Sequence, residues 1–70
     1  MTRGEIIRTR LMGLMKMNRV KHGMLGIIIE RTPQTVSKRM ANPETFTVDE
    51  LIKIARFFHV DLAELVGGSK

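Results

Sequence analysis

The chain has 70 residues, a formal net charge of +5 and no cysteine, so it is long enough for one small domain that no disulfide stabilises. Its two histidines, His22 and His59, lack acidic or thiol neighbours at metal-ligand spacing, and no apolar run reaches the ~20 residues of a membrane span. Charges interrupt the apolar residues of the N-terminus, unlike in a signal peptide. We therefore expect a cytoplasmic protein with one domain at residues 1–66, a flexible tail at 67–70, and neither metal nor cofactor.

The first two predicted helices rest on the spacing of apolar residues. In residues 5–18 these take the i, i+4, i+7 and i+8 positions of one helical face: Ile7, Leu11, Leu14 and Met15. A second, shorter helix that begins near residues 21–23 is indicated by Met24, Leu25, Ile28 and Ile29. The β-branched residues at 27–29 would also suit a strand. Because no second strand is available to pair with it, we expect a helix.

Thr32 and Pro33 predict the start of a third helix. Threonine at an N-cap accepts a hydrogen bond from a free amide, and proline at the first helical position lacks an amide that would have no partner there. The pair Asn42-Pro43 disfavours helical geometry at Asn42, so this helix spans residues 33–41. One face can pack inward through Val36 and Met40. The other faces carry small or polar residues: Gln34, Ser37, Lys38 and Ala41.

A fourth helix begins at two overlapping start signals. Thr47 and Glu50 stand at capping-box spacing, and Phe46 and Leu51 stand at hydrophobic-staple spacing. The helix runs to about His59. Its inward face is expected to hold four residues: Leu51, Ile54, Ala55 and Phe58.

The same signals recur once more and predict a fifth helix of one to two turns. Asp61 and Glu64 form the second capping box, and Val60 and Leu65 form the second staple. The predicted fold class is therefore all-α, a compact bundle of five short helices that are joined by tight connections.

Charge divides unevenly along the chain. Residues 1–42 carry nine Lys or Arg against two acidic residues, a balance of +7, whereas residues 43–70 carry three against five, a balance of −2. A basic half of this kind suits a polyanion, because each neutralised phosphate releases condensed counterions. It also suits an ordinary solvated surface that has no partner.

The third helix has the properties of a helix that reads DNA. The major groove admits one α-helix, which needs a free polar face and a second helix that braces it across a tight turn. The connection at residues 30–32 has about the required length. Gln34 can pair with adenine through its amide, Lys38 can reach guanine acceptors, and Ser37 can contact either base. Each of these residues taken alone also fits ordinary surface polarity.

Two groups of positions resemble a known family. The first follows a leucine, aliphatic, hydroxyl and threonine-valine-serine pattern: Leu25, Ile29, Thr32, Thr35, Val36 and Ser37. The second follows a core pattern: Val48, Leu51, Ile54, Ala55, Phe58, Val60, Leu62 and Leu65. With these residues the chain resembles the lambda-repressor-like, Cro and XRE family of helix-turn-helix regulators. The resemblance implies a domain that binds operator DNA, usually as a dimer, with Gln34, Ser37 and Lys38 in the groove and His22 near a phosphate.

Four positions depart from that family's pattern. Glu30 stands at its turn glycine, where a left-handed conformation would cost roughly 1–2 kcal/mol, and Gly26 stands at its customary alanine. Arg31 and Arg39 replace aliphatic residues, so we expect their stems to lie along the core with each guanidinium in solvent or on a phosphate. The predicted phosphate contacts come from six residues: Lys21, His22, Arg31, Thr35, Arg39 and Asn42.

The sequence therefore predicts a sequence-specific double-stranded DNA-binding regulator of transcription, a repressor, that acts as a homodimer and needs neither a small-molecule ligand nor a membrane. The C-terminal end is the expected dimer surface unless its residues belong to the core: Leu62, Leu65 and Val66. No residues at catalytic spacing predict an enzyme.

The alternative is a protein-interaction module, such as an antitoxin component or an adaptor. Five internal methionines could form an adaptable binding surface, although such residues more often fill a small core: Met12, Met15, Met17, Met24 and Met40. Membrane-surface binding by the basic first helix is the weaker option, since that helix carries no aromatic anchor.

Overall fold

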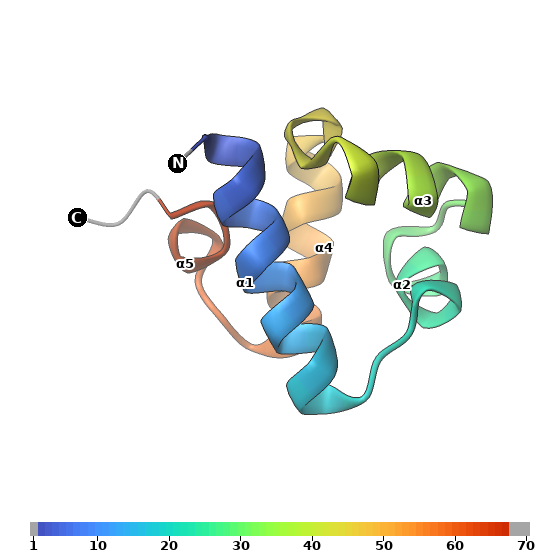
Figure 1. The fold of residues 1–70 in the computed structure, drawn as a ribbon. Coiled ribbons are helices and arrows are strands. Elements are labelled where there is room, and N and C mark those ends of the chain that lie inside the picture. The colour runs from blue at the N-terminus through green and yellow to red at the C-terminus, as the bar shows by residue number, and fades with distance from the viewer. Residues whose placement is uncertain (1, 68–70) are drawn as a thin grey trace.

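Helices follow one another without a strand in residues 2–67, the part of the chain that this computed structural model describes (Figure 1). Five α-helices lie in this part: α1 (Arg3–Asn18), α2 (His22–Ile29), α3 (Pro33–Ala41), α4 (Val48–Phe58) and α5 (Leu62–Val66). A 3-10 turn, η1 (Pro43–Thr45), joins α3 to α4 and has no counterpart in the sequence prediction. The all-helical, five-helix prediction is confirmed. Residues 68–70 of the predicted tail lie outside the described residues.

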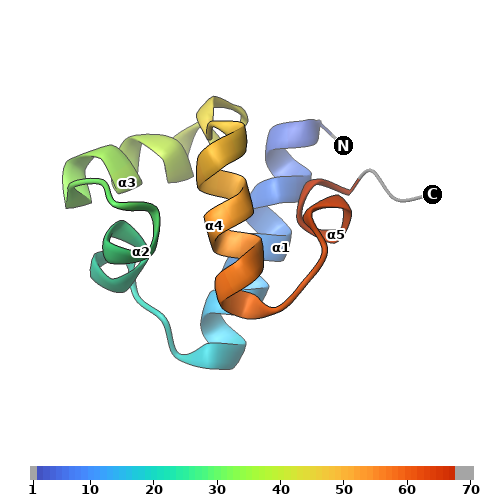
Figure 2. The same cartoon turned by 180° about the vertical axis from the view of Figure 1, so that it is seen from behind.

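The helix α4 runs through the middle of the bundle. It packs against α2 and against α5, while α1 packs against α5 and η1. The α2–α3 pair therefore forms one end of the molecule, and α5 with the start of α1 forms the other (Figure 1 and Figure 2). The core draws buried residues from every α-helix: Ile7, Leu11, Met15, Val20, Leu25, Ile29, Val36, Met40, Phe46, Leu51, Ile54 and Leu65. Only two of these lie on α3, so most of the surface of α3 stays outside the core.

Capping boxes fix the starts of α1 and α4. The Thr47 amide donates to Glu50 Oε1 at 3.0 Å and the Glu50 amide donates to Thr47 Oγ1 at 3.1 Å, as predicted. Thr2 and Glu5 form a second box, so α1 begins two residues before the expected start at Glu5. The box predicted at Asp61 is wrong. The Glu64 amide donates to the backbone carbonyl of Asp61 at 3.0 Å, and the Asp61 carboxylate makes no cap hydrogen bond.

Three helices end at a residue other than glycine in the left-handed region. Arg19 ends α1 with φ 55°, Glu30 ends α2 with φ 60°, and His59 ends α4 with φ 58°. Gly67 takes the same conformation after α5, with φ 70°. A β-carbon in this conformation clashes with the backbone, so each of the three non-glycine ends carries local strain of about 1–2 kcal/mol.

Several apolar residues are less buried than their spacing indicates. Met24 belongs to the predicted inward face of α2, yet it is 48% exposed. Two of the five internal methionines, Met15 and Met40, are buried in the core, whereas Met12 and Met17 are 54% and 82% exposed. Leu65 is buried, which removes it from the predicted dimer surface and assigns it to the core.

Candidate nucleic-acid interface

The two sides of α3 differ sharply in chemistry. Val36 and Met40 are buried and hold the helix against the rest of the bundle. The side chains of Gln34, Ser37 and Lys38 are exposed. At 3.6 residues per turn these three span an arc of about 100°, in which Gln34 and Lys38 face away from Val36 and Met40 and Ser37 lies at the flank. The helix thus presents an amide, a hydroxyl and an ammonium group together to the outside.

Local hydrogen bonds set the start of α3. Thr32 adopts extended backbone geometry as the N-cap, and its Oγ1 accepts the Thr35 amide at 3.3 Å. Pro33 occupies the first helical position, as predicted. The hydroxyls of Thr32 and Thr35 lie 3.1 Å apart, and Thr35 is half-buried. Thr35 therefore supports the cap, while its predicted phosphate contact stays a prediction.

The turn between α2 and α3 requires close packing at Gly26. A β-carbon built on Gly26 would lie 2.8 Å from the Arg31 carbonyl oxygen and 3.4 Å from Val36 Cγ2. Glu30 adopts the left-handed conformation, and the Arg31 amide donates to the Gly26 carbonyl at 2.8 Å. The absent side chain of Gly26 thus lets the turn fold directly onto α2.

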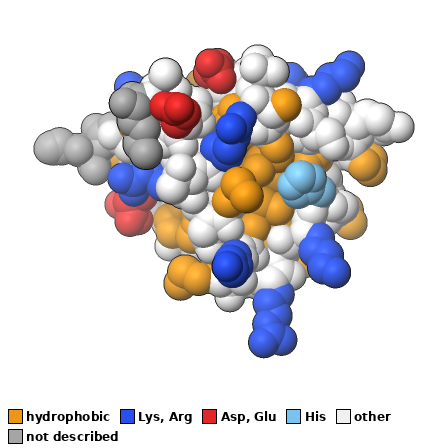
Figure 3. Space-filling view, in the orientation of Figure 1, with side chains coloured by type: hydrophobic (Ala, Val, Ile, Leu, Met, Phe, Trp, Pro, Cys, Tyr) orange, Lys and Arg blue, Asp and Glu red, His pale blue; other side chains and the backbone are white. Residues whose placement is uncertain are grey.

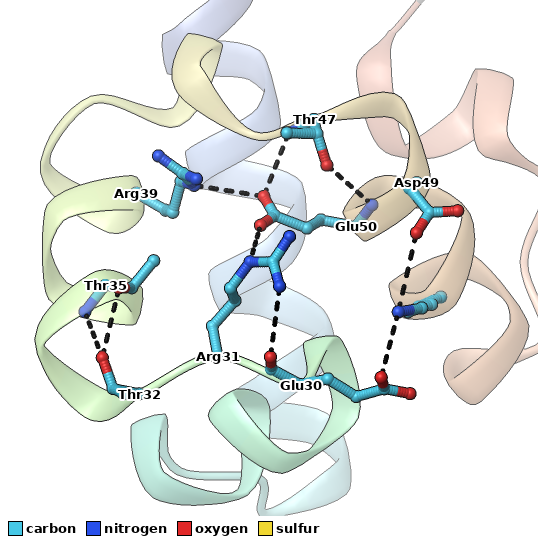
Figure 4. A network of polar contacts seen from close by, with 9 residues as sticks. Glu30, Arg31, Thr32, Thr35, Arg39, Thr47, Asp49 and Glu50 are labelled. Carbon is cyan, nitrogen blue, oxygen red and sulfur yellow. Dashed lines mark hydrogen bonds and ion pairs between the residues drawn. The ribbon is translucent and has the colours of Figure 1, made fainter.

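A buried carboxylate on α4 ties this turn and α3 to the bundle (Figure 4). Glu50 is 1% exposed. Arg31 Nε donates to Glu50 Oε2 at 2.9 Å, and Arg39 Nε donates to Glu50 Oε1 at 3.1 Å. Arg31 Nη1 also donates to the Glu30 carbonyl at 3.3 Å. The expectation that both guanidiniums lie in solvent or on phosphate is therefore wrong for their Nε atoms, which bind inside the protein because the carboxylate needs partners there.

The surroundings of Glu50 keep it ionised. Burial raises the pKa of Glu50, but the hydrogen bond from the Thr47 amide and those from Arg39 and Arg31 lower it further than burial raises it. The net effect is a pKa of Glu50 below its ordinary value. The carboxylate is thus a permanent negative partner for the two arginines at neutral pH.

A third arginine holds the other end of α3. Arg8 of α1 donates from Nε to the Met40 carbonyl at 3.2 Å and from Nη2 to the Ala41 carbonyl at 2.6 Å. The last carbonyls of a helix have no partner within it, and a cation there also opposes the negative end of the helix dipole. Arg8 thus caps α3 from a helix that lies more than thirty residues earlier in the chain.

The remaining predicted phosphate contacts are accessible. Lys21 and His22 are exposed at the start of α2, and Asn42 is exposed after α3. Among the α-helices of the described part, α2 and α3 have no acidic residue in the first turn, whereas α1, α4 and α5 have at least one. An anion approaching the positive ends of α2 and α3 thus meets no carboxylate on their first turns.

The space-filling view gives the same division of charge. Figure 3 shows Lys and Arg side chains projecting along the right and lower edges of the face formed by α1, α2 and α3. The acidic side chains visible in this view lie in its left half, toward η1 and α5. In this view the part of the molecule that carries α2 and α3 therefore shows basic side chains and no acidic one, whereas the rest of the face shows both.

Neither the ion pairs of Glu50 nor the cap formed by Arg8 was predicted from the sequence. Arg31 and Arg39 stand at positions that are aliphatic in the family that the sequence resembles, which is a sign of an acidic partner but does not identify Glu50. No local signal marks Arg8. In residues 2–67 no cluster of three or more His, Asp or Glu could hold a metal ion, and no helix there is both long and apolar enough to span a bilayer.

Comparison with protein-family models, with curated proteins and with solved structures finds no match to this chain.

Proposed function

We propose that this chain is a sequence-specific double-stranded DNA-binding regulator of transcription, a repressor, that reads the major groove with α3 as one half of a homodimer. The observation that carries the proposal is the exposed polar side of α3. Gln34, Ser37 and Lys38 point outward from a helix that the core holds from behind through Val36 and Met40. Amide, hydroxyl and ammonium groups are those that form hydrogen bonds with base edges.

Charge supports the proposal independently of α3's shape. Lys21 is the N-cap of α2 and makes no side-chain cap hydrogen bond, His22 is the first residue of α2, and neither α2 nor α3 carries an acidic residue in its first turn. Phosphates could therefore approach both helix starts and fix the register of α3 on the duplex. A single short helix reads few base pairs, so two copies spaced about 34 Å apart would supply the specificity.

The test is selection of bound duplexes from a random oligonucleotide pool, followed by affinity measurements on the consensus. Replacing Gln34 or Lys38 by alanine should cost about 1–3 kcal/mol and relax the preference at one base pair. Arg56→Ala is the control, because it removes one exposed positive charge from α4 rather than from α3. Recovery of no consensus, or equal losses from all variants on all sequences, would contradict the proposal.

The second candidate is a protein-interaction module, and one observation favours it. Met12, Met17 and Met24 are 54%, 82% and 48% exposed, so three flexible apolar side chains lie at the surface. Salt separates the two candidates. DNA binding should weaken steeply between about 50 and 200 mM salt, whereas an interface lined by methionine should be nearly insensitive.

A further inference from the structure

We propose that Glu50 is the positioning residue for α3, and that Arg31 and Arg39 act through Glu50 rather than by neutralising phosphates. This inference rests on the proposed reading of DNA by α3. It assigns to three charged residues a role that their sequence positions do not indicate. The structural basis is one buried carboxylate shared by two arginines from either end of the same helix.

The two arginines connect α4 to both ends of α3. Arg31 directly precedes the N-cap Thr32, and Arg39 lies in the last turn of α3. Glu50 lies in the first turn of α4 and accepts one Nε–H from each arginine at 2.9 and 3.1 Å. Rotating or tilting α3 against α4 would therefore break a hydrogen bond to a carboxylate that is 1% exposed. Such a break removes one of the charged partners of a buried carboxylate, which disfavours it.

The rotational setting of α3 decides what it can read. Gln34 and Lys38 lie four residues apart, so about 40° separates them around the helix axis. A rotation of that size would turn each side chain away from the base edge that it faces. Glu50 contacts neither Gln34 nor Lys38 by hydrogen bond. It acts on them by fixing the backbone that carries them.

The guanidiniums are also placed for an internal role. The side chain of Arg39 is 25% exposed and that of Arg31 is 45% exposed, and both use Nε on Glu50. The Nη1 atom of Arg31 is used as well, on the Glu30 carbonyl. Both arginines thus use Nε, and Arg31 also Nη1, to hold the turn and α3 in place.

Two variants of the full chain separate positioning from phosphate contact. Glu50→Gln keeps an acceptor for the Thr47 amide but removes the negative partner of both arginines. The triple variant Arg31→Leu, Arg39→Leu, Glu50→Gln replaces the ion pairs by apolar packing of the kind that often substitutes for buried pairs without loss. Arg56→Ala is the matched control for the triple variant, because both change the net charge by −1.

Affinity for the selected duplex is then measured against salt concentration. We expect Glu50→Gln to weaken binding about 5- to 150-fold, the range carried by one bidentate base contact, with an undiminished salt slope. The triple variant should recover most of the lost affinity, and its salt slope should equal that of the Arg56→Ala control. If both arginines bind phosphate, the slope of log affinity against log salt concentration falls by about 1.8 in the triple variant. That result would overturn the positioning role but not the proposed reading of DNA by α3.

A readout without DNA completes the test. The Nε–H signals of Arg31 and Arg39 should be dispersed and slow to exchange in NMR spectra of the wild-type chain, and should lose that protection in Glu50→Gln. Amides of α3 should exchange faster in the same variant. Unchanged signals would overturn the positioning role whatever the DNA result. Absence of selective DNA binding by the wild-type chain, with these signals protected, would overturn the proposed function and with it the reading role assigned to Glu50.

Discussion

The strained end of α4 offers a direct measure of how far local geometry limits stability. His59 has φ 58°, and its side chain is exposed and enters no hydrogen bond or ion pair among the described residues. Glycine avoids the cost of about 1–2 kcal/mol for a left-handed conformation, but it also adds about 0.4–1 kcal/mol of unfolded-state entropy. We expect His59→Gly to raise the free energy of unfolding by about 0.5–1 kcal/mol, which corresponds to roughly 2–8 °C in Tm for a chain of this length.

Thermal and urea unfolding followed by circular dichroism would measure this gain. His59→Ala is the control, because alanine keeps the β-carbon and should change stability by less than about 0.5 kcal/mol. Glu30→Gly should gain less than His59→Gly, since it also removes the ion pair between Glu30 Oε1 and Lys53 Nζ at 3.6 Å. Equal stability of the glycine and alanine variants at position 59 would refute the assignment of strain to the β-carbon.

Three further predictions concern the supports of α3 and α4. Because the pKa of Glu50 is lowered in the folded chain, its contribution to stability is complete above the unfolded value of about 4.3 and disappears as pH falls through the folded value. Urea unfolding between about pH 7 and pH 3 should therefore show a steeper acid loss for the wild-type chain than for Glu50→Gln, and parallel curves would contradict this. Gly26→Ala should destabilise by about 1–3 kcal/mol because its β-carbon meets the Arg31 carbonyl oxygen at 2.8 Å, whereas Gly13→Ala should stabilise by about 1 kcal/mol because nothing lies within 4 Å. If calorimetry showed that Gly26→Ala and Gly13→Ala change the free energy of unfolding in the same direction, the packing described at these glycines would be contradicted. Thr32→Ala should cost about 0.5–2 kcal/mol through loss of the α3 cap, and an unchanged urea midpoint would show that the cap contributes nothing.

Local signals predicted the helices well because caps and periodicity act within a few residues. Thr32 with Pro33 and Thr47 with Glu50 give the starts of α3 and α4, and these starts are confirmed. Asp61 shows the limit of such signals. It stands at the same spacing from Glu64, but its backbone carbonyl takes the amide that its carboxylate was expected to take.

The supports of α3 could not be predicted because they join residues that are distant in the chain. Glu50 meets Arg39 and Arg31 across 11 and 19 positions, and Arg8 meets the end of α3 across more than thirty. These contacts depend on how α1 and α4 are placed in space. Composition and spacing therefore indicated which face of α3 is free, but not what fixes the direction in which that face points.

The Arg8 cap makes the last turn of α3 depend on the position of α1. Deleting the residues up to and including Arg8, or fusing a rigid partner that shifts α1, would remove the hydrogen bonds to the carbonyls of Met40 and Ala41 without changing α3 itself. Expression tags for these experiments belong at the C-terminus, where they would not disturb the hydrogen bonds between Arg8 and the end of α3.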